Sequence, residues 1–203
     1  GKKIPGKKQE KTAKPLKNNI KEIYKDIKKI SSPNQQVKLL AVSKKHSAEE
    51  ILKAQKIGLL YFGESRVQEA EEKKEAYPKE GELHLIGHLQ SNKINKALKL
   101  FDVIQTIDSK KLAEKVNKKA ESINKKQRIF CQINIGKDPN KTGFSAKELI
   151  KTVSTIINLS NIKLEGIMTI LPLKKTQKER ELLFLKTKKI RDDISKKHKI
   201  PLE

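Results

Sequence analysis

Short apolar runs alternate with amphipathic segments along most of this chain, and this alternation restricts its fold more than any other feature. The segments between the runs carry apolar residues three or four positions apart, as amphipathic helices do. Because a helical segment follows each run, the sequence predicts parallel strands joined by right-handed helical crossovers. The six expected strands lie at residues 37–43, 59–63, 83–89, 103–107, 129–135 and 162–170.

Helix starts between these strands are marked by residues that cap helix N-termini. A serine followed three positions later by Glu or Gln predicts a capping box. Such pairs occur at Ser47 and Glu50, Ser65 and Gln68, and Ser145 and Glu148, and Asp108 or Ser109 is placed to cap another helix. A further apolar stripe predicts a helix over residues 16–30, ahead of the first strand.

Two α/β architectures fit this order: an open doubly wound sheet and a (β/α)8 barrel. The nine glycines form neither a G-x-G-x-x-G fingerprint nor a P-loop, so the open sheet loses its usual nucleotide ligand. A barrel typically needs about 250 residues, whereas this chain of 203 reaches six βα units. Residues 16–203 show no sharp break in composition, and we expect one domain there.

The N-terminal residues 1–15 contain six lysines, two glycines and two prolines. We expect a basic disordered tail, because this composition offers almost nothing to bury. The start of the chain lacks the apolar stretch of a signal peptide, and no window approaches the ~18 apolar residues of a membrane span. A lone Cys131 and the absence of C-x-x-C argue against a disulfide or a metal centre. These features predict a soluble, cytoplasmic protein.

The formal charge of +23 raises the possibility of a nucleic-acid or membrane partner. Of the 47 lysines and arginines, however, only four are arginine. Arginine provides the bidentate contacts to bases and phosphates, whereas lysine is a hydrated point charge. The lysines are also spread over every predicted helix, and aromatic residues make up 4% of the chain. The composition therefore favours a solvated lysine-rich surface.

Functional groups of βα proteins collect where strands end and helices begin, and Lys44 lies at such a point. It follows the apolar run that ends at Val42. An ammonium against an apolar wall and beside a second cation, here Lys45, loses part of its preference for the charged form, which makes the amine a better nucleophile towards an aldehyde. The alternative is a lysine that extends into solvent.

Other polar residues at strand ends are open to two interpretations. Gln132 and Asn134 alternate on one face of an apolar strand, where they would either line a polar pocket or brace the structure through hydrogen bonds. His84 and His88 also share a face, without the carboxylate or cysteine partners of a metal site. Cys131 is expected to pack as a small apolar residue.

The motifs at these positions resemble those of the pyridoxal phosphate homeostasis proteins. Six stretches carry the resemblance, in the family's order: Leu39–Lys44 (LLAVSK), Phe62–Glu69 (FGESRVQE), His84–Lys93 (HLIGHLQSNK), Gln132–Asn134 (QIN), Lys141–Gly143 (KTG) and Gly166–Thr169 (GIMT). Each stretch is modest alone. Six in the right order, each at an expected strand end, are specific.

The resemblance implies an alanine racemase-type (β/α)8 barrel with an extra N-terminal helix, and it implies a cofactor. Lys44 would form a Schiff base with pyridoxal 5′-phosphate (PLP). The function implied is storage and delivery of PLP in vitamin B6 homeostasis, without established catalysis and with PLP-dependent apo-enzymes as recipients. Lys141 would be a secondary lysine near the mouth. The cofactor-binding set expected from the resemblance is Lys44, Glu64, Ser65, His84, Gln132, Asn134 and Met168.

The sequence departs from the family's pattern at two places. Ser65 stands where the family usually has Asn, so the reach of an amide into the pocket is lost. The chain also ends at Glu203, before the segments that supply strands seven and eight and the phosphate site of the family. We therefore expect an incomplete, C-terminally truncated barrel with exposed edges on strands one and six and with weakened PLP binding, because charge-assisted hydrogen bonds to the phosphate are lost.

Two other functions remain as alternatives. A PLP-dependent amino-acid racemase would need a second base on the opposite face of the imine. The three tyrosines, Tyr24, Tyr61 and Tyr77, all lie away from the predicted strand ends. A basic nucleic-acid-binding protein would need clustered lysines and stacking aromatic residues. The sequence favours the PLP carrier over both.

Overall fold

Six parallel strands, paired in the order in which they occur in the chain, form the centre of the molecule. The computed structural model describes residues 15–203, so nearly all of the predicted basic tail lies outside the described residues. The strands are β1 (Leu40–Val42), β2 (Tyr61–Glu64), β3 (Glu82–Leu85), β4 (Val103–Ile107), β5 (Gln127–Gln132) and β6 (Ile162–Met168). The predicted incomplete barrel of six βα units is confirmed.

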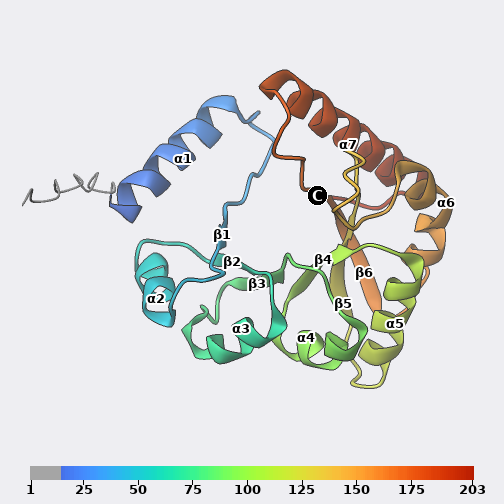
Figure 1. The fold of residues 1–203 in the computed structure, drawn as a ribbon, viewed down its shortest axis with the longest axis horizontal. Helices are drawn as coiled ribbons and strands as arrows, with labels where there is room; N and C mark the ends of the chain where they lie inside the picture. The colour runs from blue at the N-terminus through green and yellow to red at the C-terminus, as the bar shows by residue number, and fades with distance from the viewer. Residues whose placement is uncertain (1–14) are drawn as a thin grey trace, which may run out of the picture.

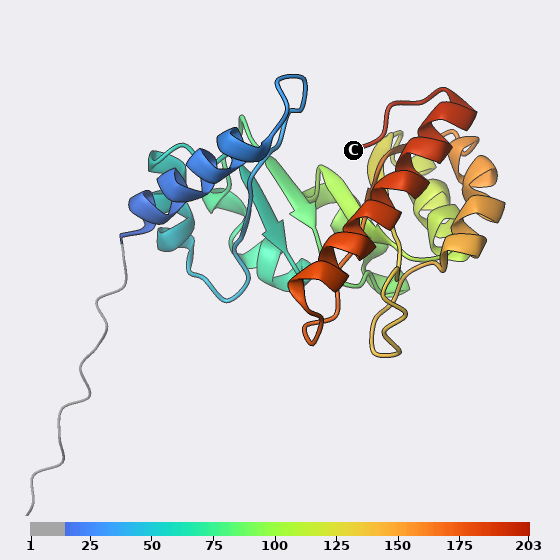
Figure 2. The same cartoon turned by 90° about the horizontal axis from the view of Figure 1, so that it is seen from above.

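Helices follow each strand and cover the outer side of the curved sheet (Figures 1 and 2). Their bounds are α1 (Leu16–Ile30), α2 (Ala48–Lys56), α3 (Val67–Glu72), η1 (Lys74–Ala76), η2 (Ser91–Lys93), α4 (Ile94–Leu100), α5 (Lys110–Glu121), α6 (Ala146–Ile157) and α7 (Gln177–His198). In Figure 1, α1 and α7 flank the side on which the sheet stays open, between β1 and β6. No helix in the described part of the chain is long and apolar enough to cross a membrane.

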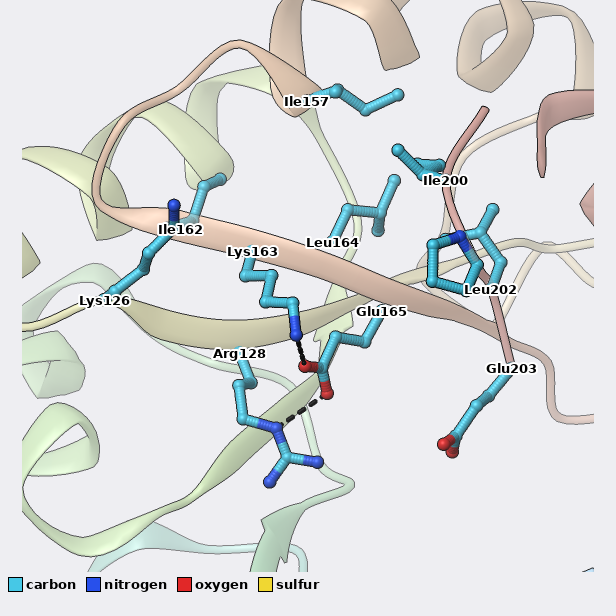
Figure 3. A pocket seen from close by; sticks show the side chains of 11 residues that line it. Lys126, Arg128, Ile157, Ile162, Lys163, Leu164, Glu165, Ile200, Leu202 and Glu203 are labelled. Atoms are coloured by element: carbon cyan, nitrogen blue, oxygen red, sulfur yellow. Dashed lines mark hydrogen bonds and ion pairs between the residues drawn. The ribbon is translucent and has the colours of Figure 1, made fainter. Parts of the chain in front are cut away.

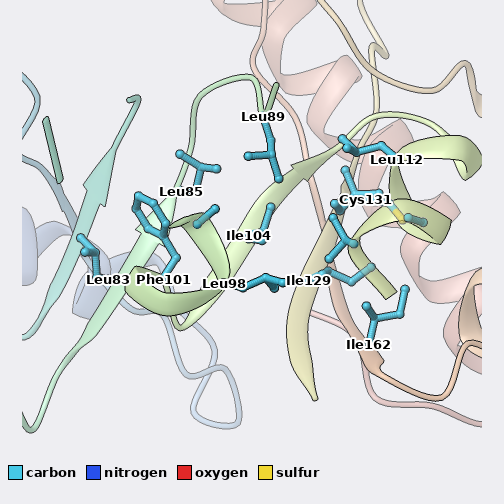
Figure 4. Close-up of a cluster of buried hydrophobic side chains, with 14 of the residues drawn as sticks. Leu83, Leu85, Leu89, Leu98, Phe101, Ile104, Leu112, Ile129, Cys131 and Ile162 are labelled. Carbon is cyan, nitrogen blue, oxygen red and sulfur yellow. The ribbon is translucent and has the colours of Figure 1, made fainter. Parts of the chain in front are cut away.

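The apolar core lies between the sheet and the outer helices. Alternate strand residues point into it, and Leu85, Ile104 and Ile129 are fully buried there. Figure 4 shows these side chains meeting Leu98 of α4 and Leu112 of α5. The opposite strand faces turn towards the inside of the curve, where polar side chains are frequent. Because alternate residues of each strand are buried in the core, only the residues that face the inside of the curve are available for a site.

Three of the predicted helix caps are present, and one is absent. Ser47 and Ser145 form complete capping boxes with Glu50 and Glu148, and the Ser109 side chain accepts from the backbone N–H of Leu112. The capping box predicted at Ser65 is wrong: α3 begins at Val67, and its N-cap residue, Arg66, makes no side-chain cap. After β2 the chain bends at Ser65, and Arg66 is still extended.

The first strand differs from its prediction in length and burial. It spans only Leu40–Val42 within the predicted range 37–43, and Val42 is 46% exposed. The expectation of a strand buried on both faces is wrong, because β1 pairs only with β2 in the described sheet and its inner face opens towards the gap.

The edge of β6 is partly covered, which corrects the expectation of an exposed edge there. The backbone N–H of Glu203 donates to Glu165 O at 2.7 Å, and Glu203 O accepts from the N–H of Ile167 at 2.9 Å. Gly166 permits this approach, since a Cβ at that position would lie 2.8 Å from Glu203 O. The Glu203 carboxylate also reaches Lys38 Nζ, ahead of β1, at 3.5 Å.

Candidate functional site

Lys44 lies in the tight turn that connects β1 to α2, at the carboxyl edge of the sheet. The next residue, Lys45, has φ = 64°, a left-handed conformation that costs about 1–2 kcal/mol for a residue with a side chain. The side chain of Lys44 is exposed. The apolar wall expected around its amine is therefore not formed, because the neighbouring inner face of β1 is open.

A buried carboxylate braces the sheet directly beside this turn. The Glu64 side chain is fully buried, and its Oε1 accepts three hydrogen bonds: from Ser43 Oγ at 2.8 Å, from Tyr77 OH at 2.7 Å and from Lys73 Nζ at 2.5 Å. Its Oε2 is buried without a partner in the described structure. Glu64 follows Phe62 on the outer side of β2 and so points towards α3 and η1, away from the inside of the curve.

Burial and hydrogen bonds to Glu64 change the pKa values of two groups in this cluster, Tyr77 and Lys73. Burial and the hydrogen bond to Glu64 raise the pKa of the Tyr77 hydroxyl, so it stays protonated. Burial alone would lower the pKa of Lys73, but its hydrogen bonds to Glu64 and Glu69 outweigh that effect and raise it. The cluster therefore contains a charged lysine and a neutral tyrosine, both hydrogen-bonded to the Glu64 side chain.

Lys73, Tyr77 and Glu69 were not anticipated from the sequence as parts of the site. Lys73 follows α3 and Tyr77 follows η1; both reach back to Glu64 of β2, and Lys73 also reaches Ser43, just after β1. The i, i+4 spacing of Glu69 and Lys73 is the one local signal of a pair, which the structure shows at 3.0 Å. Their contact with the Lys44 turn depends on tertiary packing.

Gln132 and Asn134 organise the loop that leads from β5 to α6. Gln132 Nε2 donates to Thr142 O at 3.1 Å. Asn134 Nδ2 donates to Asp138 O at 2.8 Å and to Lys141 O at 3.1 Å. Both amides thus brace the loop, the second of the two interpretations left open by the sequence. Lys141 lies in this loop and is partly buried.

His84 belongs to a layer of polar and charged side chains inside the curve, level with Val42 and so two residues before Lys44 along the strand direction. It pairs with Gly63, which pairs with Val42. The ring forms hydrogen bonds through both nitrogens: Nε2 lies 2.9 Å from Glu82 Oε2, and Nδ1 lies 2.8 Å from Gln105 Nε2. Burial lowers the pKa of His84, partly opposed by the carboxylate of Glu82. A cavity of about 530 Å³ adjoins this layer.

Arg128 extends the same layer across the sheet. Its guanidinium donates to Glu82 Oε1 at 2.9 Å. It also donates to Glu165 Oε2 at 2.6 Å, and Lys163 reaches the same carboxylate (Figure 3). The cavity drawn there, about 440 Å³, lies at the amino ends of β5 and β6. It is remote from the carboxyl edge that carries Lys44, so we do not place the site there.

The two remaining residues expected at the site lie at the carboxyl edge on separate strands. Met168 ends β6 and lines a cavity of about 350 Å³ between that strand and α7. Ser65 follows β2 and lines a polar cavity of about 330 Å³ that also contains His88. Among the described residues, no group of three or more His, Cys, Asp or Glu side chains could hold a metal ion. Ser65 and Met168 thus lie at the same edge of the sheet as Lys44, but they line separate cavities.

Comparison with known proteins places this geometry among characterised folds. The family model for the alanine racemase N-terminal domain matches residues 16–203. Pyridoxal phosphate homeostasis proteins of Synechocystis sp. and Pasteurella multocida are each 35% identical; the alignments cover 89% and 76% of this chain and 83% and 70% of those proteins.

Solved structures agree with the sequence comparisons. PipY of Synechococcus elongatus with PLP bound superposes with a TM-score of 0.77 at 31% identity, over 90% of this chain and 85% of PipY. An alanine racemase of Clostridium difficile, with a TM-score of 0.73 at 20% identity over 91% of this chain and 49% of the racemase, shares the fold. Motifs, barrel topology and relatives agree, and the chain belongs to the pyridoxal phosphate homeostasis protein family, built on the alanine racemase N-terminal fold.

Proposed function

We propose that this chain binds PLP as a Schiff base on Lys44 and holds it for storage and delivery in vitamin B6 homeostasis. The observation that carries the proposal is an exposed amine at the carboxyl edge of the sheet, on a turn whose backbone is held by neighbouring side chains. Relatives that share the motif are named for pyridoxal phosphate homeostasis, and PipY has been solved with PLP bound.

The chemistry asked of Lys44 is reversible condensation with an aldehyde. Its neutral amine attacks the carbonyl carbon, and water leaves as the carbon–nitrogen double bond forms. The exposure of Lys44 allows the ligand to be exchanged, because a second amine can reach the imine carbon, displace the Lys44 amine and so release the ligand. A bound aldehyde is meanwhile withheld from stray amines.

Roles for the other residues follow from where their side chains lie. Within this proposal, Ser65 and Met168 contact the ligand from the ends of β2 and β6, and His84 forms the floor below Lys44. Three other residues support the site indirectly, because their polar atoms already form hydrogen bonds within the protein: Glu64 with Ser43, Gln132 with Thr142 and Asn134 with Lys141. Lys141 is proposed as a secondary lysine on the loop that Asn134 braces.

Storage is favoured over racemisation by the positions of the three tyrosines. A racemase needs a second base facing the imine. Tyr24 lies on α1, Tyr61 begins β2 at its amino end, and Tyr77 donates to Glu64 on the helix side. With its pKa raised, the Tyr77 hydroxyl stays protonated and cannot accept a proton. We therefore propose a non-catalytic carrier, with PLP-dependent apo-enzymes as recipients.

The decisive experiment compares Lys44→Arg with its neighbour Lys45→Arg. A guanidinium keeps the positive charge but cannot form the imine. Each protein is mixed with PLP, scanned for the imine absorbance, reduced with borohydride and mapped by peptide mass. We expect the parent and Lys45→Arg to carry the adduct on Lys44, and Lys44→Arg to lose the site-specific adduct. An adduct spread evenly over surface lysines in the parent would refute the proposal, and interconversion of L- and D-alanine would favour the racemase.

A further inference from the structure

We propose that Lys73 is a positioning residue for Lys44: its ammonium clamps the turn from which the reactive amine extends. The inference rests on the proposed function, because it concerns how Lys44 meets an aldehyde. It assigns a task to a residue that lies 29 positions further along the chain and contacts the turn only through the fold.

The contacts of Lys73 bracket Lys44 on both sides. Its Nζ donates to Ser43 O, immediately before Lys44, at 2.9 Å and to His46 O, two residues after it, at 3.1 Å. The N–H of His46 donates back to Ser43 O at 3.1 Å, which closes the turn. One ammonium therefore holds the carbonyls at both ends of the turn.

Two carboxylates hold the ammonium in place. Glu64 Oε1 lies 2.5 Å and Glu69 Oε1 lies 3.0 Å from Nζ, and the Lys73 side chain is only 10% exposed. Glu69 Oε1 also accepts from the N–H of Lys45 at 2.5 Å. This bond secures the residue with φ = 64° next to Lys44.

The arrangement fixes the backbone of Lys44 and leaves its side chain free. Ser43 N–H donates to Gly63 O at 3.0 Å, so the turn is also tied to β2. Every contact described falls on residues 43, 45 or 46, whereas the Lys44 side chain itself is exposed. Restricting the base of a reactive side chain raises the fraction of productive encounters, since small displacements of a reacting group are costly.

Lys125 offers a matched comparison within the same chain. Its Nζ also donates to two backbone carbonyls, Leu98 O at 2.5 Å and Phe101 O at 3.2 Å, where α4 ends. It lies near the amino end of β5, away from the Lys44 turn. Loss of Lys125 should lower stability without altering Lys44, so the two variants separate a positioning role from a purely structural one.

The test uses Lys73→Met, Lys73→Arg and Lys125→Met in the full chain. Each is treated with PLP and borohydride, and the ratio of adduct on Lys44 to adduct on all other lysines is measured by peptide mapping. Thermal unfolding is recorded in parallel. We expect Lys73→Met to lower this ratio at least about tenfold, Lys73→Arg to restore most of it, and Lys125→Met to lower the melting temperature while leaving the ratio unchanged.

Three outcomes overturn the inference: an unchanged ratio in folded Lys73→Met, an equal fall in Lys125→Met, or no recovery in Lys73→Arg. If Lys73→Met does not fold, Glu69→Ala tests the same clamp by releasing the Lys45 N–H, and an unchanged ratio there rejects it. Failure of the proposed function is distinguishable, because the parent protein would then show no preference for Lys44.

Discussion

Cys131 lies in the apolar layer between the sheet and the helices, with no exposed surface (Figure 4). Burial raises the pKa of its thiol to about 12. The thiolate is the reactive form of cysteine, so we expect native protein at pH 8 to resist thiol-specific reagents. The same reagents should modify one thiol per chain in denaturant. Rapid modification of folded protein would contradict the packing described here.

His84 makes stability depend on pH near neutrality. Its pKa in the folded chain is lowered from 6.5, chiefly by burial. The neutral ring is therefore favoured by folding, and this contribution is present above pH 6.5 and is lost as the pH falls below that value. We expect urea denaturation to show a loss of stability between pH 7.5 and 5.5 that is smaller in His84→Gln. Equal losses would show that the ring does not titrate in this way.

Much of the residue-level picture could be predicted, but the partners of single residues could not. Burial of Cys131 followed from its place in the predicted strand over residues 129–135. Glu64 was expected among the ligand contacts, although strand alternation from buried Phe62 puts it on the helix side. The sequence left open whether Lys44 lies against an apolar wall or extends into solvent, because the answer depends on the open face beside β1, which no local pattern reports.

At the level of elements, helix caps were the features that local sequence predicted best. A capping serine acts within three residues, so Ser47, Ser109 and Ser145 could be found without knowledge of the fold. Strand ends were less accurate, since pairing with a neighbour sets them: residues 37–39 were expected in β1 but lie outside the pairing that begins at Leu40 and Tyr61.

The caps support a direct comparison of two serines. Ser145→Ala removes a capping box at the start of α6 and should lower the free energy of unfolding by about 1 kcal/mol. Ser65→Ala removes a serine that precedes α3 without capping it, and the change should be within about 0.5 kcal/mol. Urea denaturation of both variants measures the difference. A large loss for Ser65→Ala would require a cap that the structure lacks.

At the scale of the whole molecule, Arg128 links strands across the inside of the sheet. It joins Glu82 of β3 to Glu165 of β6. Arg128→Met leaves two partly buried carboxylates without this partner, and we expect a loss of about 2 kcal/mol, below that of a fully buried pair.

The pH dependence of stability in the Arg128→Met variant tests whether Arg128 stabilises the fold through its ion pairs with Glu82 and Glu165. The pKa values of Glu82 and Glu165 are lowered, since the hydrogen bonds of Glu82 to Arg128 and His84, and those of Glu165 to Arg128 and Lys163, outweigh burial. Their contribution is present above pH 4.5 and fades as the pH falls through their folded pKa values. The stability gap between parent and variant should therefore narrow in acid. A gap independent of pH would point to lost packing instead of lost charge.

The exposed amine on the clamped turn faces competition from its own chain. Of 47 lysines and arginines four are arginine, so 42 other lysines offer the same chemical group to an aldehyde. For half of a single equivalent to reside on Lys44, that amine must outbind an average rival about 40-fold, equivalent to about 2.2 kcal/mol. The number of competing surface lysines thus sets the minimum preference for the aldehyde that the turn around Lys44 has to provide.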